Sequence, residues 1–208
     1  MTKPILALTS LLMTGSLLAG TAPAPYTAPV PVPAPEQVSL LNYNTIELGW
    51  IHTEWDNALL DSSDGASASF SWSPVQNFYL AAGGAWESVD VAGESADLWR
   101  ANAGLGGYVS LGGGIDFVAE AGAAFYGYDN ARSGSEDDAS AYAKPHFRGR
   151  WGAFETHVGA AWTNLDISNE WAGFARFYVA VMENVDLSAG ISAGSEEYTI
   201  NAGLRFRY

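Results

Sequence analysis

The chain ends in the stretch EYTINAGLRFRY, residues 197–208, and this stretch decides the fold. Apolar and aromatic residues occupy every second position, and polar or charged residues lie between them. The apolar set is Tyr198, Ile200, Ala202, Leu204, Phe206 and Tyr208, and the polar set is Thr199, Asn201, Gly203, Arg205 and Arg207. Successive side chains of a β-strand point to opposite faces, so the pattern predicts a strand with one apolar and one polar face.

Two segments precede the expected strands. Lys3 is followed by an apolar run over residues 5–18 and by small residues at 19–22, which is typical of a secretory signal peptide, so we expect residues 1–22 to be removed. Residues 23–40 repeat Ala-Pro and Val-Pro, which favours an extended polyproline conformation and predicts a solvated periplasmic spacer. No later stretch approaches the roughly 20 apolar residues of a spanning helix, so membrane residence of residues 41–208 would require a barrel.

Alternation with period two, broken at turn residues, divides residues 41–208 into ten segments of about the length of a tilted spanning strand. The segments are residues 43–55, 65–73, 78–89, 96–111, 115–128, 139–151, 154–166, 171–181, 185–194 and 197–208. Alternate connections are tight, and the others are mostly longer and acidic. We therefore predict an all-β fold, a closed antiparallel up-and-down transmembrane β-barrel of ten strands, with eight strands as the alternative.

Aromatic residues gather near both ends of the expected strands, as in two interfacial girdles. Near the tight turns these are Trp72, Phe78, Trp151, Phe154, Phe206 and Tyr208, and near the other ends Trp50, Trp86, Trp99, Phe125, Trp162 and Trp171. Together with the signal peptide and the terminal aromatic residue, the pattern resembles the small outer-membrane β-barrels of Gram-negative bacteria, of porin-like or surface-antigen-like kind. A secreted soluble barrel or sandwich would alternate in the same way but would bury its apolar face.

The resemblance implies a bacterial outer-membrane location after export. It also implies two partners, the outer-membrane lipid and the barrel-assembly machinery, which would recognise the C-terminal strand through the insertion signal Phe206 and Tyr208. The apolar positions expected to face lipid are Ile46, Leu48, Phe70, Leu80, Ala101, Leu105, Val109, Phe117, Ala121, Val158, Val179 and Leu187.

Charged residues fall on the opposite face, toward the lumen. A simple register sets Arg150 opposite Glu155 and Arg148 opposite His157, and closure of the barrel sets Arg205 between the strands of Asp186 and Glu47. We expect a network of ion pairs that closes most of the lumen, because side chains fill narrow barrels. Its members are Glu47, Asp116, Glu120, Lys144, Arg148, Arg150, Glu155, Arg176, Asp186, Arg205 and Arg207. The alternative is a narrow pore for ions or small solutes, lined by guanidinium groups.

One residue fits its strand poorly. Pro145 lies in the middle of a predicted strand and has no backbone N–H, so we expect a local β-bulge there.

The formal net charge of −14 argues against nucleic-acid binding, which needs a basic face. The acids concentrate in the longer connections, for example at Glu136, Asp137 and Asp138, which makes divalent cations candidate partners. The stretch 129–138 lacks the spacing of an EF-hand, and no motif indicates a metal or cofactor.

A search for a catalytic constellation finds no matching nucleophile, base and acid at the outer rim. His146 and His157 are expected among arginines deep in the lumen, and the parity of His52 points toward lipid. The sequence thus predicts a non-enzymatic outer-membrane barrel with a structural or surface-interaction role. The narrow pore is the alternative, and a surface enzyme that modifies lipid or peptide is the weakest hypothesis.

Overall fold

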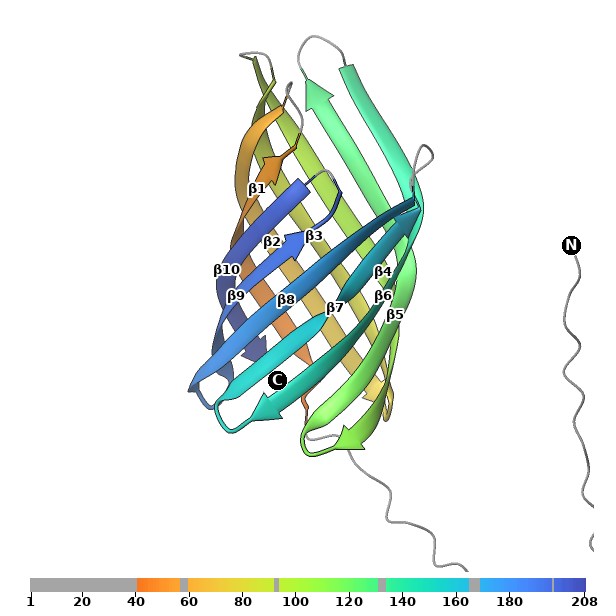
Figure 1. Ribbon diagram of the computed structural model, residues 1–208, viewed down its shortest axis with the longest axis vertical. Coiled ribbons are helices and arrows are strands. Elements are labelled where there is room, and N and C mark those ends of the chain that lie inside the picture. Colours follow the sequence, from red (N-terminus) through yellow and green to blue (C-terminus); the bar gives the residue numbers. More distant parts are fainter. Residues whose placement is uncertain (1–40, 57–59, 92–93, 131–133, 165–168, 196) are drawn as a thin grey trace, which may run out of the picture. The chain divides into compact units, whose positions relative to one another are not determined.

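The computed structural model describes residues 41–56, 60–91, 94–130, 134–164, 169–195 and 197–208. Its ten strands are β1 (Thr45–Trp55), β2 (Leu60–Val75), β3 (Phe78–Val91), β4 (Glu94–Gly112), β5 (Ile115–Asn130), β6 (Gly134–Trp151), β7 (Phe154–Asn164), β8 (Asn169–Met182), β9 (Val185–Ala193) and β10 (Glu197–Arg207). Each strand pairs with its neighbours in sequence and β10 pairs with β1, which closes the barrel (Figure 1). The fold class and the count of ten strands are confirmed. The predicted signal peptide, residues 1–22, and spacer, residues 23–40, lie outside the described residues.

The seam between β1 and β10 shows how period two separates the two faces. Ile46 lies opposite Phe206, and both side chains are exposed on the outer wall. Glu47 lies opposite Arg205, which is buried in the lumen. The alternation in the last strand therefore distinguishes the outer wall of the barrel from its interior.

Four tight turns lie at one end of the barrel, which we call the turn end. They join β2 to β3, β4 to β5, β6 to β7 and β8 to β9. Gly113 and Gly114 have φ of 64° and 80°, a left-handed backbone that glycine adopts without a steric cost. Residues 41–44 and the C-terminus lie at this end too, since the Tyr208 N–H donates to the Asn44 carbonyl at 3.2 Å.

The opposite end, which we call the loop end, is reached by strands longer than the alternation predicts. β2, β4 and β6 have 16, 19 and 18 residues, and they begin before the expected residues 65, 96 and 139 (Figure 1). Pairing of β5 with β6 continues through acidic residues as far as Asn130 and Gly134. Where both faces of a sheet are solvated, backbone pairing does not require alternation of apolar and polar residues. The hydropathy pattern therefore does not predict this part of the strands.

The predicted bulge at Pro145 is wrong. The β6–β7 pairs stop at Ala143 and Trp162 and resume at His146 and Gly159 with the same register on both sides. Pro145 still lies opposite Ala119 of β5. The missing N–H of proline therefore removes pairs from the ladder without inserting an extra residue into the strand.

The outer wall is apolar along the strands. Leu48, Leu105 and Val158 have exposed fractions of 52%, 66% and 51%. Of the predicted outward positions, Ile46, Leu48, Phe70, Leu80, Leu105, Val109, Phe117, Ala121, Val158, Val179 and Leu187 are exposed, and Ala101 is half-buried. Aromatic side chains are exposed near both ends, with Trp72, Phe78, Trp151, Phe154, Phe206 and Tyr208 toward the turn end and Trp50, Trp86, Phe125 and Trp171 toward the loop end.

Candidate functional site

Charged side chains of the lumen converge on Glu155 of β7. One carboxylate oxygen lies 2.8 Å from Arg148 Nη2 and 2.7 Å from Arg205 Nη1, and His157 Nε2 lies 2.8 Å from the same oxygen. Arg205 Nη2 donates to the other oxygen at 2.9 Å, and Arg150 Nη1 lies 3.9 Å from it. The predicted register holds, because Arg150 lies opposite Glu155 and Arg148 opposite His157. The shortest ion pairs nevertheless run to Arg148 and Arg205.

Asp186 of β9 forms the second half of this cluster. Arg205 Nε and Nη2 donate to Asp186 Oδ2 at 2.8 and 2.7 Å, and Arg207 Nη2 lies 3.0 Å from Oδ1. Arg205 thus joins the carboxylates of Glu155 and Asp186 in a position where its side chain is only 3% exposed. We call the set Arg148, Arg150, Glu155, His157, Asp186, Arg205 and Arg207 the turn-end network.

The segment of residues 41–44 enters the turn end of the lumen. Tyr43 is 3% exposed, and its ring stacks on that of Tyr108 with centroids 3.9 Å apart and an interplanar angle of 4°. The guanidinium carbon of Arg148 lies over the Tyr43 ring, 4.1 Å from the ring centroid. Tyr43 Oη donates to Asp116 Oδ2 at 2.8 Å, and burial raises the pKa of this phenol well above its ordinary value, so the hydroxyl stays protonated.

The backbone of this segment is held on both sides. Arg148 Nη2 donates to the Asn42 carbonyl at 3.0 Å, and Ser71 Oγ donates to the Tyr43 carbonyl at 2.8 Å. Leu41 and Tyr43 pack with Tyr79 and Val118 in the buried apolar cluster of the barrel. The alternation pattern predicted a first strand that begins at Tyr43, whereas β1 begins at Thr45. An aromatic ring at a position of the polar face was the only sign in the sequence that Tyr43 enters the lumen.

Two more predicted acids lie higher in the lumen and are bound mainly by tyrosines. Glu120 accepts hydrogen bonds from Tyr79 Oη and Tyr142 Oη, both at 2.9 Å. Glu47 accepts one from Tyr178 Oη at 3.1 Å, and Arg176 Nη1 lies 3.6 Å from the same carboxylate. Lys144 faces the lumen as predicted, but its Nζ lies 5.2 Å from the Phe174 ring centroid, and no carboxylate of the described residues forms an ion pair with it within 4.0 Å.

A second cluster at the loop end, which we call the loop-end network, was missed by the sequence analysis. Glu87 is 1% exposed and accepts hydrogen bonds from Thr53 Oγ1 at 2.7 Å and Ser63 Oγ at 2.9 Å. Arg100 pairs with Glu87 and, at 3.1 Å, with Glu197. Counting by twos along the third strand from the lumenal Gly83 and Ala85 would have found Glu87.

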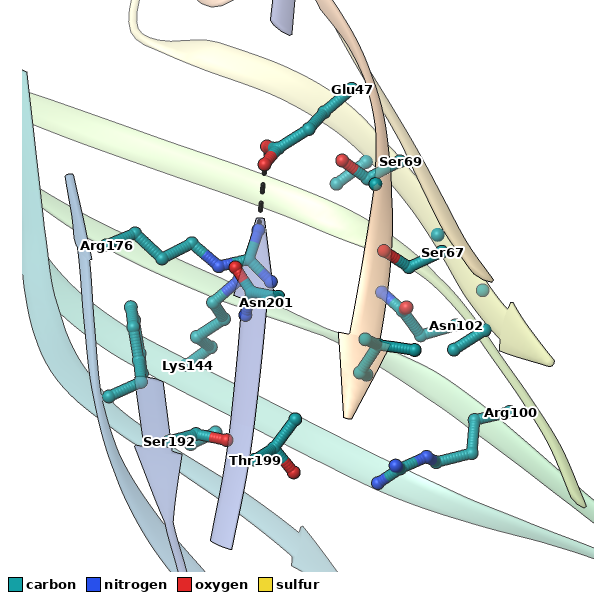
Figure 2. A pocket seen from close by; sticks show the side chains of 18 of the residues that line it. Glu47, Ser67, Ser69, Arg100, Asn102, Lys144, Arg176, Ser192, Thr199 and Asn201 are labelled. Carbon is teal, nitrogen blue, oxygen red and sulfur yellow. Dashed lines mark ion pairs between the residues drawn. The ribbon is translucent and has the colours of Figure 1, made fainter. Parts of the chain in front are cut away.

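A cavity of about 620 Å³ occupies the lumen between the two networks. Figure 2 shows Lys144 and Arg176 on one side of it and Ser67, Ser69 and Asn102 on the other. Apolar groups such as Phe174 contribute to the same lining. The size lies in the range of small-molecule pockets, and the wall offers both fixed cations and hydrogen-bonding groups.

The two residues of the expected insertion signal lie on the outer wall. Phe206 and Tyr208 are 39% and 55% exposed, and the Tyr208 ring stacks against Phe70 of β2 with centroids 6.4 Å apart. No group of three or more His, Cys, Asp or Glu side chains suited to a metal ion is found among the described residues. Glu136 and Asp137, predicted in an acidic connection, lie in β6 opposite Tyr128 and Gly127, and the positions of their side chains are outside the description.

Comparison with protein-family models and with curated protein sequences gives no match. Comparison with solved structures finds barrels of similar fold. The translocator domain of the autotransporter NalP from Neisseria meningitidis is 10% identical, with 82% of this chain and 91% of that chain covered and a TM-score of 0.48. The outer membrane protein OprG from Pseudomonas aeruginosa is 10% identical, with 83% and 99% covered and a TM-score of 0.48.

The attachment invasion locus protein Ail of Yersinia pestis is also similar, with 10% identity, 80% and 100% of the two chains covered and a TM-score of 0.43. The closed antiparallel barrel of ten strands is the fold that the resemblance to small outer-membrane β-barrels implies. In the part of the chain that the structure describes, no helix is long and apolar enough to cross a membrane.

Proposed function

We propose that the protein is an outer-membrane β-barrel with a structural or surface-interaction role, and that its lumen is closed at the turn end. The observation that carries the proposal is the inverted distribution of side chains. Leu105, Phe154 and Trp171 are 66%, 60% and 59% exposed on the outer wall, whereas Glu155 and Arg205 are buried inside. Exposure of this apolar wall to water would be unfavourable, whereas contact with lipid would not be.

The orientation in the membrane follows from the same features. Short turns of bacterial barrels lie in the periplasm and longer connections lie outside. The turn end, with residues 41–44 and Tyr208, would then face the periplasm, and the loop end would face the medium. Outer-membrane lipid would contact the exposed wall, and the assembly machinery would recognise Phe206 and Tyr208 on the closing strand.

Closure of the lumen rests on the turn-end network and on Tyr43. The arginines and carboxylates of the network reach across the barrel between β6, β7, β9 and β10, and Tyr43 fills space beside them. Such buried pairs satisfy one another in a lumen that is too narrow to hydrate them fully. A narrow pore is the second candidate, and the cavity above the network favours it. We propose no catalytic activity, and divalent cations stay a prediction for the acidic loops.

Membrane residence can be tested with single-tryptophan variants refolded into vesicles whose acyl chains carry bromine. Trp72 is 45% exposed on the outer wall, whereas Trp55 lines the lumenal cavity. We expect brominated lipid to quench the fluorescence of the Trp72 variant strongly and that of the Trp55 variant weakly. Equal, weak quenching of both tryptophans, with folded protein recovered from the aqueous phase, would favour a soluble barrel instead.

A further inference from the structure

Lys144 forms no ion pair within 4.0 Å with a carboxylate of the described residues. It lies opposite Glu120 in the β5–β6 register, where an ion pair would be expected. Each Glu120 oxygen instead accepts one hydrogen bond from a tyrosine hydroxyl, Tyr79 or Tyr142, at 2.9 Å, and Lys144 attracts this carboxylate only from a longer distance. The Lys144 ammonium lies near the Phe174 ring and lines the cavity. An ammonium has three donors, and ring contact uses none of them as a conventional hydrogen bond.

Arg176 brings a second cation to the same cavity with donors to spare. Its Nη1 is 3.6 Å from Glu47, a carboxylate that Tyr178 Oη also contacts at 3.1 Å. A guanidinium carries five N–H donors, and Glu47 and the Tyr178 hydroxyl engage only part of them. Figure 2 shows the ends of Arg176 and Lys144 in the same part of the cavity, near Asn201.

The opposite wall of the cavity offers neutral hydrogen-bonding groups, which lie between the charged residues Glu47 and Arg100. Ser67 and Ser69 of β2 and Asn102 of β4 lie there (Figure 2), and Ser192 and Thr199 also line the space. Hydroxyl and amide groups donate and accept hydrogen bonds and would match the hydroxyl groups of a polar solute. The cavity therefore places Lys144 and Arg176 on one side and neutral hydrogen-bonding groups on the other. Further acids and arginines complete its lining, namely Glu47, Glu120, Glu170, Glu197, Arg100, Arg148 and Arg205.

We propose that this cavity binds a small organic anion that carries hydroxyl groups, such as a polyhydroxy carboxylate. Lys144 and Arg176 hold its carboxylate, and Ser67, Ser69 and Asn102 hydrogen-bond to its hydroxyls. The net charge of −14 does not prevent this attraction, because Lys144 and Arg176 act at short range in a low dielectric, whereas surface acids are screened by salt. Of the acids that line the cavity, Glu47 and Glu120 already accept hydrogen bonds from tyrosine hydroxyls. The proposal goes beyond membrane residence and closure and does not require either.

The two lysines of the chain, Lys3 and Lys144, allow a direct test. The full chain is reductively methylated with ¹³C in urea and refolded in detergent, so that Lys144 gives one dimethylamine resonance, assigned by its loss in Lys144→Arg. We expect gluconate to shift this resonance saturably and to leave the Lys3 resonance unchanged. Sorbitol, which has the hydroxyl groups but no carboxylate, should have no effect. An unshifted Lys144 resonance at high gluconate concentration would overturn the proposal.

Sulfate and variants separate the parts of the site. If the hydroxyl groups matter, sulfate should bind at least tenfold more weakly than gluconate, and equal binding would overturn the polyhydroxy assignment.

By calorimetry, Lys144→Met should weaken gluconate binding by about tenfold or more, the usual effect of losing a hydrogen bond to a charged group. Arg150→Met removes a cation that does not line the cavity and should leave affinity unchanged. Equal loss in both variants would indicate a general charge effect and contradict the assigned site.

Discussion

At the residue scale, Glu155 is a buried carboxylate that depends on buried ion pairs. Two guanidinium groups, those of Arg148 and Arg205, lie within 2.8 Å of its carboxylate, and all three side chains are nearly inaccessible. Each charge has lost its water, so each depends on the others for compensation. Arg150, which the cross-strand register sets directly opposite, is 3.9 Å away with a side chain 22% exposed. Arg148 and Arg205 therefore contribute most of the stabilisation of the buried Glu155 carboxylate.

Replacing Glu155 with Gln should lower the free energy of unfolding by about 3 to 5 kcal/mol, because two buried guanidinium groups lose their shared counter-ion. Urea titration of the refolded barrel in lipid vesicles measures this change. The matched control is Glu54→Gln on the outer wall, where the side chain is 68% exposed and a change within about 0.5 kcal/mol is expected. Equal unfolding midpoints for the two variants would show that the network does not stabilise the barrel.

At the element scale, alternation predicted all ten strands but not everything that they carry. Cross-strand neighbours such as Glu47 and Arg205 follow from register, because pairing is local. The contact of Arg205 with Glu155 crosses the lumen from β10 to β7, and no pairwise register contains it. The entry of Tyr43 into the lumen depends on packing between segments far apart in sequence. Pro145 was recognised as irregular, but its effect was a gap in the ladder and not a bulge.

The gap beside Pro145 makes a prediction for hydrogen exchange. Ala160 and Ala161 of β7 pair with β8 but have no partner in β6. Alternate amides of a strand point to opposite neighbours, so one of these two N–H groups faces the gap. That amide should exchange faster than those of residues 157–159. Pro145→Ala should slow this exchange, because the new N–H can donate to a β7 carbonyl and draw the two strands together. Equal protection of Ala160, Ala161 and Gly159 would contradict an open ladder.

At the scale of the whole molecule, the barrel is apolar outside and charged inside. Its turn end is filled by residues 41–44 and the turn-end network, and its middle holds a polar cavity of about 620 Å³. The distribution of side chains between inside and outside could be predicted from the sequence, because period two fixes it. The cavity could not, because its volume depends on which side chains across the lumen satisfy one another. Glu120 is such a case, because it accepts hydrogen bonds from Tyr79 and Tyr142 and forms no ion pair within 4.0 Å with Lys144, the residue opposite it.

The most direct test of the central claim is single-channel conductance of the refolded protein in a planar bilayer, after heat-modifiable gel migration has verified folding. We predict that the unmodified protein is silent, as the proposed closure of the lumen by the turn-end network and Tyr43 requires. Tyr43→Ala should produce discrete steps, whereas Tyr198→Ala, the same truncation at a residue 40% exposed on the outer wall, should stay silent. Discrete steps from the unmodified protein, equal to those of Tyr43→Ala, would contradict a closed barrel and establish the pore.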